Sequence, residues 1–348
     1  MNLAAVNRIA TALLYEGYML YPYRTSAVKN QQRFNFGVLY PRTYAETHES
    51  EAWSSQTECL VLGKQGAIEV RVKFLHLVER TIHEFVSSAT SDGEERRMVE
   101  RLEVDGEVFH SWQEAVEEEI CLPALSLESL VNDKGQFPAE FPPSQSDELI
   151  ENSRGETVGA ISRKRLPLSI RVDVSAKEQM LGVFKLLIQV SNLTQIPASQ
   201  TSREQALLHS LISTHKVLGV TEGELVSLLD PPESLRGFVD TCQNIGSFPV
   251  LVGERGERDT MLASPIILYD YPEIAAESAG DLFDATEIDE ILSLRIMTLT
   301  EEEKREVRSS DARARRILER TETLPEEQIM KLHGALRGLR PTQRERAR

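Results

Sequence analysis

The chain has little cysteine. Its three cysteines, Cys59, Cys121 and Cys242, are odd in number and lie far apart in a sequence of 348 residues. This spacing excludes a disulfide framework and a CxxC zinc knuckle. We therefore interpret all three as small buried hydrophobic side chains in a reducing compartment, in preference to reactive thiols.

The sequence also lacks an excess of basic residues. Its 39 lysines and arginines are outnumbered by 55 aspartates and glutamates, which gives a formal net charge of −16. A protein that binds nucleic acid over much of its surface carries a basic footprint, so this balance argues against that class. The balance suits a cytoplasmic protein, or one that docks a basic partner.

Long apolar runs are missing as well, since none approaches the ~20 residues of a membrane-spanning helix. The N-terminus resembles a signal peptide at first sight, but Asn7 and Arg8 interrupt its apolar stretch and no convincing cleavage site follows. Its apolar residues share one helical face: Leu3, Val6, Ala10, Leu13 and Leu14. We predict an amphipathic helix, no membrane span, no export and a cytoplasmic location.

The sequence also lacks motifs with known chemistry. The seven histidines form no HExxH, no GxSxG is present, and Gly17 and Gly37 are isolated rather than parts of a phosphate loop. We accordingly predict no cofactor, no metal site and no catalytic residue. The alternative is a hydrolase-like enzyme with a pocket assembled from distant segments, in which His215 and Asp259 would act with a hydroxyl group.

What the chain does have is a concentration of aromatic and basic residues over residues 13–44. Six of the eight tyrosines fall in this segment, with cations between them. Aromatic rings combine apolar area with a polar handle, and guanidinium groups stack on them. The segment is either a core wedge or a recognition surface, and its overall acidic context disfavours nucleic acid as the partner. The candidate recognition residues are Tyr18, Tyr21, Tyr23, Arg24, Lys29 and Arg33.

A second unusual stretch, Glu273–Glu290, holds seven acids and no lysine or arginine. Hard cations bind oxygen ligands, but this spacing fits no EF-hand. Acids that precede a helix are also favoured by its dipole without any metal. We favour helix capping and a solvated acidic face, and we keep Asp281, Asp284 and Glu287 as a second candidate surface for a basic partner.

Strand patterns dominate residues 58–194. Residues 58–62 and 68–78 predict a hairpin around Gly63–Gly66, and residues 101–112 predict another that turns at Asp105-Gly106. Residues 113–120 have a helical pattern, and the proline-rich residues 123–155 are typical of a loop. Residues 168–174 and 184–191 predict neighbouring strands. About seven strands result, which is the number in many β-sandwiches.

The predicted fold class is α+β, with four parts. An N-terminal helix and aromatic-basic segment (residues 1–50) would pack on a β-sandwich-like domain (residues 51–200). A small α/β unit (residues 201–300) would follow after the loop at Pro197–Ser202. Capping pairs such as Thr300 with Glu303 then indicate a helical C-terminal region (residues 301–348), which ends in a basic tail.

Residues 14–41, 207–235 and 259–304 resemble a bacterial protein family found in gene clusters of NiFe uptake hydrogenases. The resemblance implies an accessory, assembly or maturation role with a protein partner, possible partners being hydrogenase subunits, and it names no active-site residue. Metal-delivery accessories need cysteine pairs or histidine clusters, which this sequence lacks. We therefore predict a non-catalytic binding or assembly factor that recognises a subunit or precursor, rather than a carrier of nickel or iron.

Overall fold

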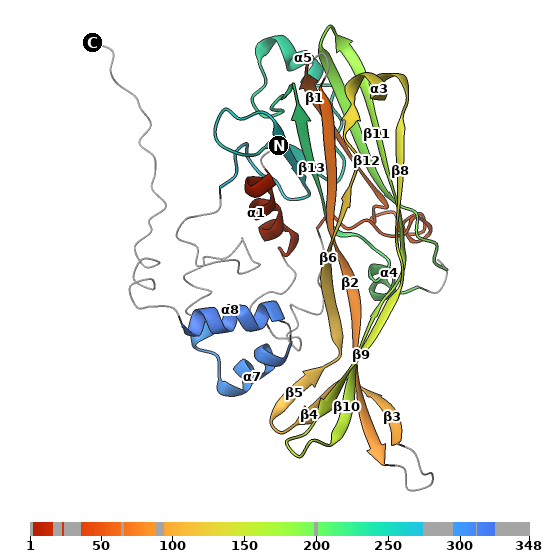
Figure 1. Cartoon of the computed structure of the whole chain (residues 1–348), viewed down its shortest axis with the longest axis vertical. Coiled ribbons are helices and arrows are strands. Elements are labelled where there is room, and N and C mark those ends of the chain that lie inside the picture. The colour runs from red at the N-terminus through yellow and green to blue at the C-terminus, as the bar shows by residue number, and fades with distance from the viewer. Residues whose placement is uncertain are drawn as a thin grey trace, which may run out of the picture.

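The computed structural model describes residues 3–16, 23, 36–63, 66–87, 94–197, 201–273, 295–310 and 312–323. Antiparallel strands are the main regular structure of these residues and helices are few, so the fold is a β-rich α+β fold. The strands gather at one end of the molecule in a body, and several of them continue into a long arm (Figure 1).

One sheet has five strands in the order β14-β1-β12-β11-β8. Their bounds are β14 Glu224–Leu225, β1 Ser54–Leu62, β12 Val183–Asn192, β11 Leu168–Met180 and β8 Gly135–Phe141. The predicted pairing of residues 168–174 with residues 184–191 is confirmed, because β11 and β12 pair antiparallel from Ile170 opposite Asn192 onward.

The other large sheet has nine strands and is organised around β2. Its main path is β15-β16-β13-β2-β10-β9, and β3, β6 and β7 also pair with β2. The bounds are β2 Ala67–Ser87, β3 Glu94–Val99, β6 Trp112–Cys121, β7 Leu125–Ser126, β9 Ser144–Glu151, β10 Thr157–Arg165, β13 Ile212–Thr221, β15 Phe248–Leu251 and β16 Thr260–Ser264. Because β2 is 21 residues long, it runs from the body into the arm (Figure 1).

A third, two-stranded sheet lies in the arm. It consists of β4 (Arg101–Val104) and β5 (Glu107–His110). Asp105 and Gly106 join the strands with φ angles of 51° and 85°. Positive φ at both central residues is the geometry that an Asp-Gly turn favours, so the hairpin predicted over residues 101–112 is confirmed.

The two large sheets contribute to the same hydrophobic core. Strand residues point alternately to the two faces of a sheet. Accordingly, alternate residues of β11 and β12 and of parts of β1, β2 and β13 join in one buried cluster. Representative members are Cys59, Val172, Leu186, Val70 and Leu218. This cluster fixes how the loops at the ends of the two sheets sit relative to each other.

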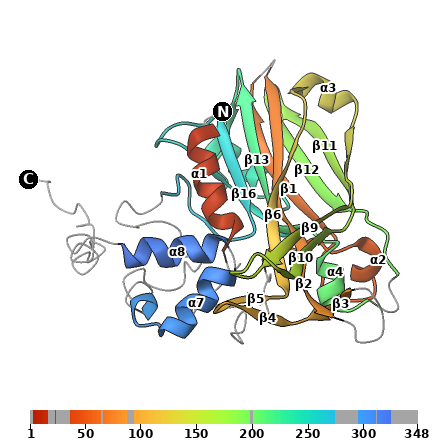
Figure 2. The same ribbon diagram turned by 60° about the horizontal axis from the view of Figure 1, so that its bottom comes forward.

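The helices lie outside the sheets. They are α1 Leu3–Leu14, α2 Arg42–Ala45, α3 Leu127–Asn132, α4 Arg203–Leu207, η3 Glu233–Leu235 (a 3₁₀ turn), α5 Arg236–Val239, α7 Glu301–Ser310 and α8 Ala312–Glu322. The predicted amphipathic N-terminal helix is confirmed, since Val6 and Ala10 of α1 are buried against Val217 and Leu262 of the nine-stranded sheet. Helices α7 and α8 lie beside the arm (Figure 2). No helix in the described ranges is long and apolar enough to cross a membrane.

Three local predictions are wrong. Residues 58–62 and 68–78 do not form a hairpin, because β1 and β2 belong to different sheets. Residues 113–120 are part of strand β6 rather than a helix, and they pair with β2. Residues 123–155 are not a loop, since they contain β7, α3, β8 and β9. Pro138 is tolerated because β8 is an edge strand, where a missing N–H breaks no ladder.

The predicted boundary near residue 200 does not separate two sets of strands. Strands β13, β15 and β16 from the segment assigned to a small α/β unit join the sheet of β2, and β14 pairs with β1. The described chain on either side of this predicted boundary therefore contributes strands to the same two sheets. Nine of the ten residues of β13 are buried, which is the environment of an interior strand rather than of a separate small unit.

Candidate functional site

Most of the predicted recognition residues lie outside the residues that the structure describes. These are Tyr18, Tyr21, Arg24, Lys29 and Arg33 in the aromatic-basic segment, and Asp281, Asp284 and Glu287 in the acidic stretch. Tyr23 is described, and its side chain is only 1% exposed in a core cluster. Tyr23 thus occupies a core position, which corrects its assignment to an exposed surface.

The other described tyrosines of the segment are also packed inside the protein. Tyr15, Tyr40 and Tyr44 belong to the same core cluster as Tyr23. The Arg313 guanidinium of α8 lies 3.9 Å from the centre of the Tyr15 ring, and the Tyr40 and Tyr44 rings stack at 5.3 Å. For these four rings the core-wedge interpretation holds, because packing provides their apolar contacts.

The residues suggested for a hydrolase do not converge. His215 is fully buried, where its Nδ1 contacts the Ser213 carbonyl and its Nε2 contacts the Ser264 hydroxyl. Burial lowers the pKa of His215 to about 4. Asp259 accepts a hydrogen bond from the Thr260 hydroxyl. Asp259 directly precedes β16, whereas Ser264, which contacts His215, is the last residue of β16, five residues further along the chain. At ~3.3 Å per strand residue, His215 and Asp259 are therefore too far apart to form a catalytic pair.

The cysteines are also unsuited to nucleophilic chemistry. Cys59 is buried as predicted, but Cys121 is exposed and Cys242 is half-buried, which corrects the prediction for those two. Desolvation raises the pKa of each of the three thiols. A raised pKa reduces the thiolate fraction at neutral pH. Within the described ranges, no group of three or more His, Cys, Asp or Glu side chains could hold a metal ion.

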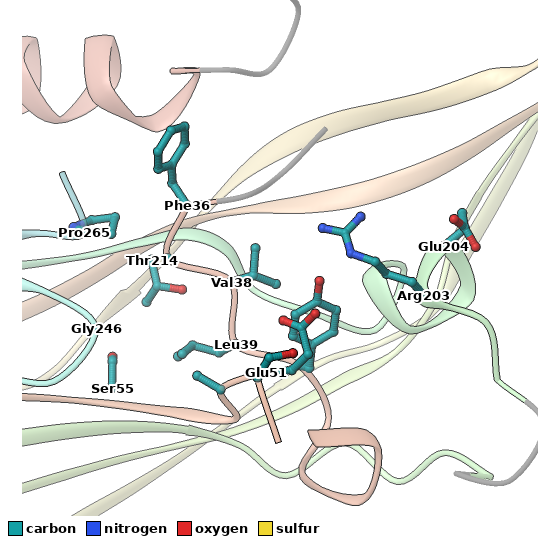
Figure 3. Close-up of a pocket in the computed structure, with 14 residues that line it drawn as sticks. Phe36, Val38, Leu39, Glu51, Ser55, Arg203, Glu204, Thr214, Gly246 and Pro265 are labelled. Carbon is teal, nitrogen blue, oxygen red and sulfur yellow. The ribbon is translucent and has the colours of Figure 1, made fainter. Parts of the chain in front are cut away.

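A pocket of about 680 Å³ lies where the aromatic-basic segment meets the body. We call it the Tyr40 pocket. It is lined by Phe36, Gly37, Val38, Leu39, Tyr40, Ser50, Glu51, Ala52, Ser55, Arg203, Glu204, Thr214, Gly246 and Pro265. Figure 3 shows that these residues come from segments far apart in the sequence, including β1, α4 and β13.

The backbone around the pocket is held by specific bonds. Leu39 and Leu211 exchange two backbone hydrogen bonds, and the buried Asn192 amide donates to the Leu39 carbonyl at 2.9 Å. Thr214 N–H donates to the Gly37 carbonyl instead of to β2, where the β13 register shifts. Next to it, Ser213 has a φ of 54°. Bulges with such strained residues often redirect a side chain at a functional site, and here the bulge turns Thr214 into the pocket.

Two hydroxyl groups give the pocket its unusual floor. Ser55 is 2% exposed and Thr214 is 1% exposed. Neither Ser55 Oγ nor Thr214 Oγ1 has a hydrogen-bond partner in the part of the chain that the structure describes. Figure 3 shows both oxygens directed into the pocket. Because a buried polar group without a partner is costly, these two hydroxyls are suited to a ligand that supplies the missing hydrogen bonds.

The other end of the pocket is charged. Glu51 and Glu204 lie on its wall, and the Arg203 side chain extends from α4 toward the pocket (Figure 3). Burial raises the pKa of the Tyr40 hydroxyl to about 12, against a smaller opposing effect of Arg203. Tyr40 is therefore a neutral hydroxyl at physiological pH. The pocket combines side chains of positive and negative charge with hydroxyl groups and apolar walls, as binding sites commonly do.

A lysine lies directly behind this floor. Lys216 is 0% exposed, and its Nζ contacts Thr57 Oγ1 at 3.1 Å and Ser247 Oγ at 2.8 Å. Thr57 lies two residues after Ser55 on β1, Lys216 two residues after Thr214, and Ser247 one residue after Gly246. We call Thr57, Lys216 and Ser247 the Lys216 cluster. No carboxylate pairs with Lys216 among the described residues, and burial lowers its pKa to about 7.

Sequence reasoning missed both features. The available signal for Lys216 was a single lysine at the start of the mostly apolar stretch Lys216–Val220. Its partners could not be found in that way, because Thr57 and Ser247 lie 159 and 31 residues away in the sequence. In the sequence, Thr214 is one of several hydroxyl residues near His215. Nothing local shows that its side chain would be buried without a partner.

Gly37 offers a direct test of the pocket geometry. Its φ is 54°, and a Cβ atom there would lie 2.6 Å from Pro265 Cγ. Gly37→Ala should lower the free energy of unfolding by ~2 kcal/mol, because it adds left-handed strain and a clash. Urea unfolding of both variants measures this effect. Gly237→Ala in α5 is the control, since a Cβ there meets nothing within 4 Å and should be neutral or stabilising. Equal effects of the two substitutions would contradict the geometry.

No protein-family model and no curated protein matches the chain.

Proposed function

We propose that this chain is a non-catalytic binding or assembly factor, and that it binds one group of its partner in the Tyr40 pocket. The observation that carries the proposal is the pair of buried hydroxyls, Ser55 Oγ and Thr214 Oγ1, which face the pocket and have no hydrogen-bond partner among the described residues. Within the protein alone these groups are a net cost to stability, so a bound acceptor explains why they point inward.

The surroundings favour binding over catalysis. The pocket walls come from both large sheets, which share one core, and we infer that the sheets form a β-sandwich-like frame that holds the walls rigidly. Rigid walls reduce the entropy that a partner loses on binding. The groups suggested for hydrolysis, His215 and Asp259, are engaged elsewhere and are not among the lining residues.

We further propose that the partner is a protein, and hydrogenase subunits are the first candidates. This assignment rests on the resemblance of residues 14–41, 207–235 and 259–304 to the hydrogenase-associated family. The first of these ranges includes Phe36–Tyr40, which forms one wall of the pocket. A protein segment such as a loop or a chain end has the size to place one side chain or terminus in about 680 Å³.

A bulky side chain at the rim tests this proposal. Ser50 is exposed and lines the pocket, so Ser50→Trp should block entry without disturbing the core. Purified hydrogenase subunits are measured against immobilised wild type and against the variant, and the expected loss of affinity is about tenfold or more. Ser153→Trp, in the exposed turn between β9 and β10, is the matched control and should bind as wild type does.

The outcomes separate the parts of the proposal. Unchanged binding by Ser50→Trp would show that the partner does not use the pocket. No binding of hydrogenase subunits by the wild type would exclude them as partners. Equal losses in Ser50→Trp and Ser153→Trp would indicate an effect unrelated to the pocket, which also contradicts the proposal.

A further inference from the structure

The Lys216 cluster is a buried positive charge without a counter-charge. Lys216 is fully buried, and the described residues place no carboxylate within ion-pair distance of it. Buried charges in proteins are normally paired or coordinated, because an isolated ion loses its hydration without compensation. The cluster also connects the two sheets, since Thr57 belongs to β1 and Lys216 to β13.

The Lys216 cluster also has an excess of hydrogen-bond donors. A protonated lysine has three N–H donors, and each hydroxyl has one donor and can accept. Lys216 donates to Thr57 and Ser247, and these two hydroxyls contact each other at 3.1 Å, which can use only one of their two protons. Among the described residues, one N–H and one O–H are then left without an acceptor. The cluster therefore has more hydrogen-bond donors than acceptors and no negative charge.

The neighbouring Tyr40 pocket also has hydroxyl donors for which the described residues provide no acceptor. Ser55 and Thr214, the unpartnered hydroxyls of the floor, precede Thr57 and Lys216 by two residues on the same strands. Ser55 and Thr57 lie on the same face of the regular strand β1 at a spacing of ~7 Å, and Thr57 Oγ1 contacts Lys216 Nζ. Donors from the floor and the charge of the Lys216 cluster therefore act on the same end of the Tyr40 pocket.

We propose that this end of the Tyr40 pocket binds a carboxylate group, whose negative charge is balanced by Lys216 and whose oxygens accept hydrogen bonds from Ser55 and Thr214. The proposal rests on the proposed function, because it names the chemical group that the same pocket takes. A carboxylate has two acceptor oxygens and a single charge. Glu51 and Glu204 on the pocket wall would oppose a more highly charged anion such as phosphate.

Binding should depend on pH through Lys216. An anion favours the protonated amine, so the affinity should be highest near pH 6 and should fall as the pH rises toward 9. Among the groups around the pocket, Tyr40 has a raised pKa of about 12 and His215 has a lowered pKa of about 4, so neither titrates in this window. His215 is the titratable group that interacts with Lys216. Hydrogen bonds to its own backbone and to Ser202 lower the pKa of Glu204, the other group of the pocket wall with a shifted pKa, so it does not titrate in this window either.

Acetate is the probe for the test, with sodium chloride at equal ionic strength as the reference. Acetate should raise the melting temperature of the wild type at pH 6 and much less at pH 9. Calorimetry in two buffers with different ionisation enthalpies should show proton uptake on binding at pH 8. Lys216→Met should abolish the acetate effect and the proton uptake, and the double variant Ser55→Ala and Thr214→Val should weaken binding by about tenfold. Lys177→Met, at an exposed position of β11, should behave as wild type.

Several results would overturn the inference. These are an acetate effect that equals the chloride effect, an effect that persists in Lys216→Met, or phosphate binding more tightly than acetate.

A pair of short neutral peptides, one with a free and one with an amidated C-terminus, identifies the source of the carboxylate. Preference for the free terminus indicates a chain end of the partner. Equal weak binding of both peptides, together with acetate binding, indicates a small carboxylate.

Failure of this inference can be distinguished from failure of the proposed function. If Ser50→Trp loses the partner but acetate has no specific effect, the pocket is a binding site for a different group. If acetate binds in the expected way but Ser50→Trp retains the partner, the carboxylate site is correct and the partner uses another surface.

Discussion

Lys216→Met is expected to raise the free energy of unfolding at pH 6 to 7, although it removes two hydrogen bonds from the interior. The wild-type ammonium is fully buried without a carboxylate partner, and its pKa falls from 10.5 to about 7. A shift of this size corresponds to a penalty on the order of 5 kcal/mol for keeping the group charged. The Thr57 and Ser247 hydroxyls lie 3.1 Å apart in the wild type, so they can keep their mutual hydrogen bond in the variant.

The sign of the pH dependence follows from the protons bound in each state. Between about pH 7 and pH 10.5 the unfolded chain keeps Lys216 protonated while the folded protein releases the proton. The free energy of unfolding therefore rises with pH across this window. Below pH 7 both states are protonated and the full penalty applies. Above pH 10.5 both states are neutral and the penalty disappears.

Urea unfolding of the wild type and Lys216→Met at several pH values between 6 and 10 measures this effect. The difference between the two proteins should be largest at pH 6 and should shrink toward pH 10. The other lysines, tyrosines and cysteines titrate in both proteins, so their contributions cancel in the difference between the two free energies of unfolding. Lys177→Met removes an exposed lysine and should show no such trend. A constant difference between wild type and Lys216→Met would contradict the assigned burial cost.

Elements with local signals could be predicted from the sequence. The hairpin at Asp105-Gly106 was predictable because that dipeptide readily adopts positive φ at both positions. Helix α4 begins at a capping box in which Ser202 and Gln205 satisfy each other's backbone donors. Helix α7 begins in a similar way, with Glu303 accepting from the N–H of Thr300. In each case the determining contacts lie within four residues.

Strand β6 shows why other elements could not be predicted. Its sequence, WQEAVEEEIC, is rich in glutamate, which favours helices. In the structure the glutamates lie beside cations of neighbouring strands. Glu119 pairs with Arg71 and Lys73 of β2, and Glu118 with Arg165 of β10. Cross-strand charge pairs stabilise a sheet, but their partners are distant in sequence, so local propensity gave the wrong element.

The candidate site was predictable only in part. The aromatic-basic segment was recognised as unusual, and its described end, Phe36–Tyr40, does form a pocket wall. The floor could not be predicted, because Ser55, Thr214 and Lys216 are ordinary residues until two distant strands, β1 and β13, meet. A serine or a lysine becomes informative only when its burial and its lack of partners are known. Both are properties of tertiary packing.

The second large effect is expected in the arm, where Glu114→Ala should lower the free energy of unfolding by about 3 kcal/mol, as for the loss of one partner in a buried ion pair. Glu114 lies 3.4 Å from Arg80 and 2.8 Å from Arg163. The Arg80 side chain is only 5% exposed, so the loss of this carboxylate removes a counter-charge from a mostly buried cation. Arg80 also donates to the Ser309 carbonyl of α7, so the change should loosen the helix as well.

Urea unfolding of three variants separates charge from packing at this position. Glu103→Ala removes a carboxylate that is 58% exposed and pairs with Arg101, and surface pairs of this kind contribute at most ~1 kcal/mol. The double variant Arg80→Met and Glu114→Met removes both partners of the pair and should be clearly more stable than Glu114→Ala, because the buried Arg80 charge is gone and Arg163 still pairs with Glu148. If the double variant is as unstable as Glu114→Ala, Glu114 stabilises the arm by its packing rather than by neutralising Arg80.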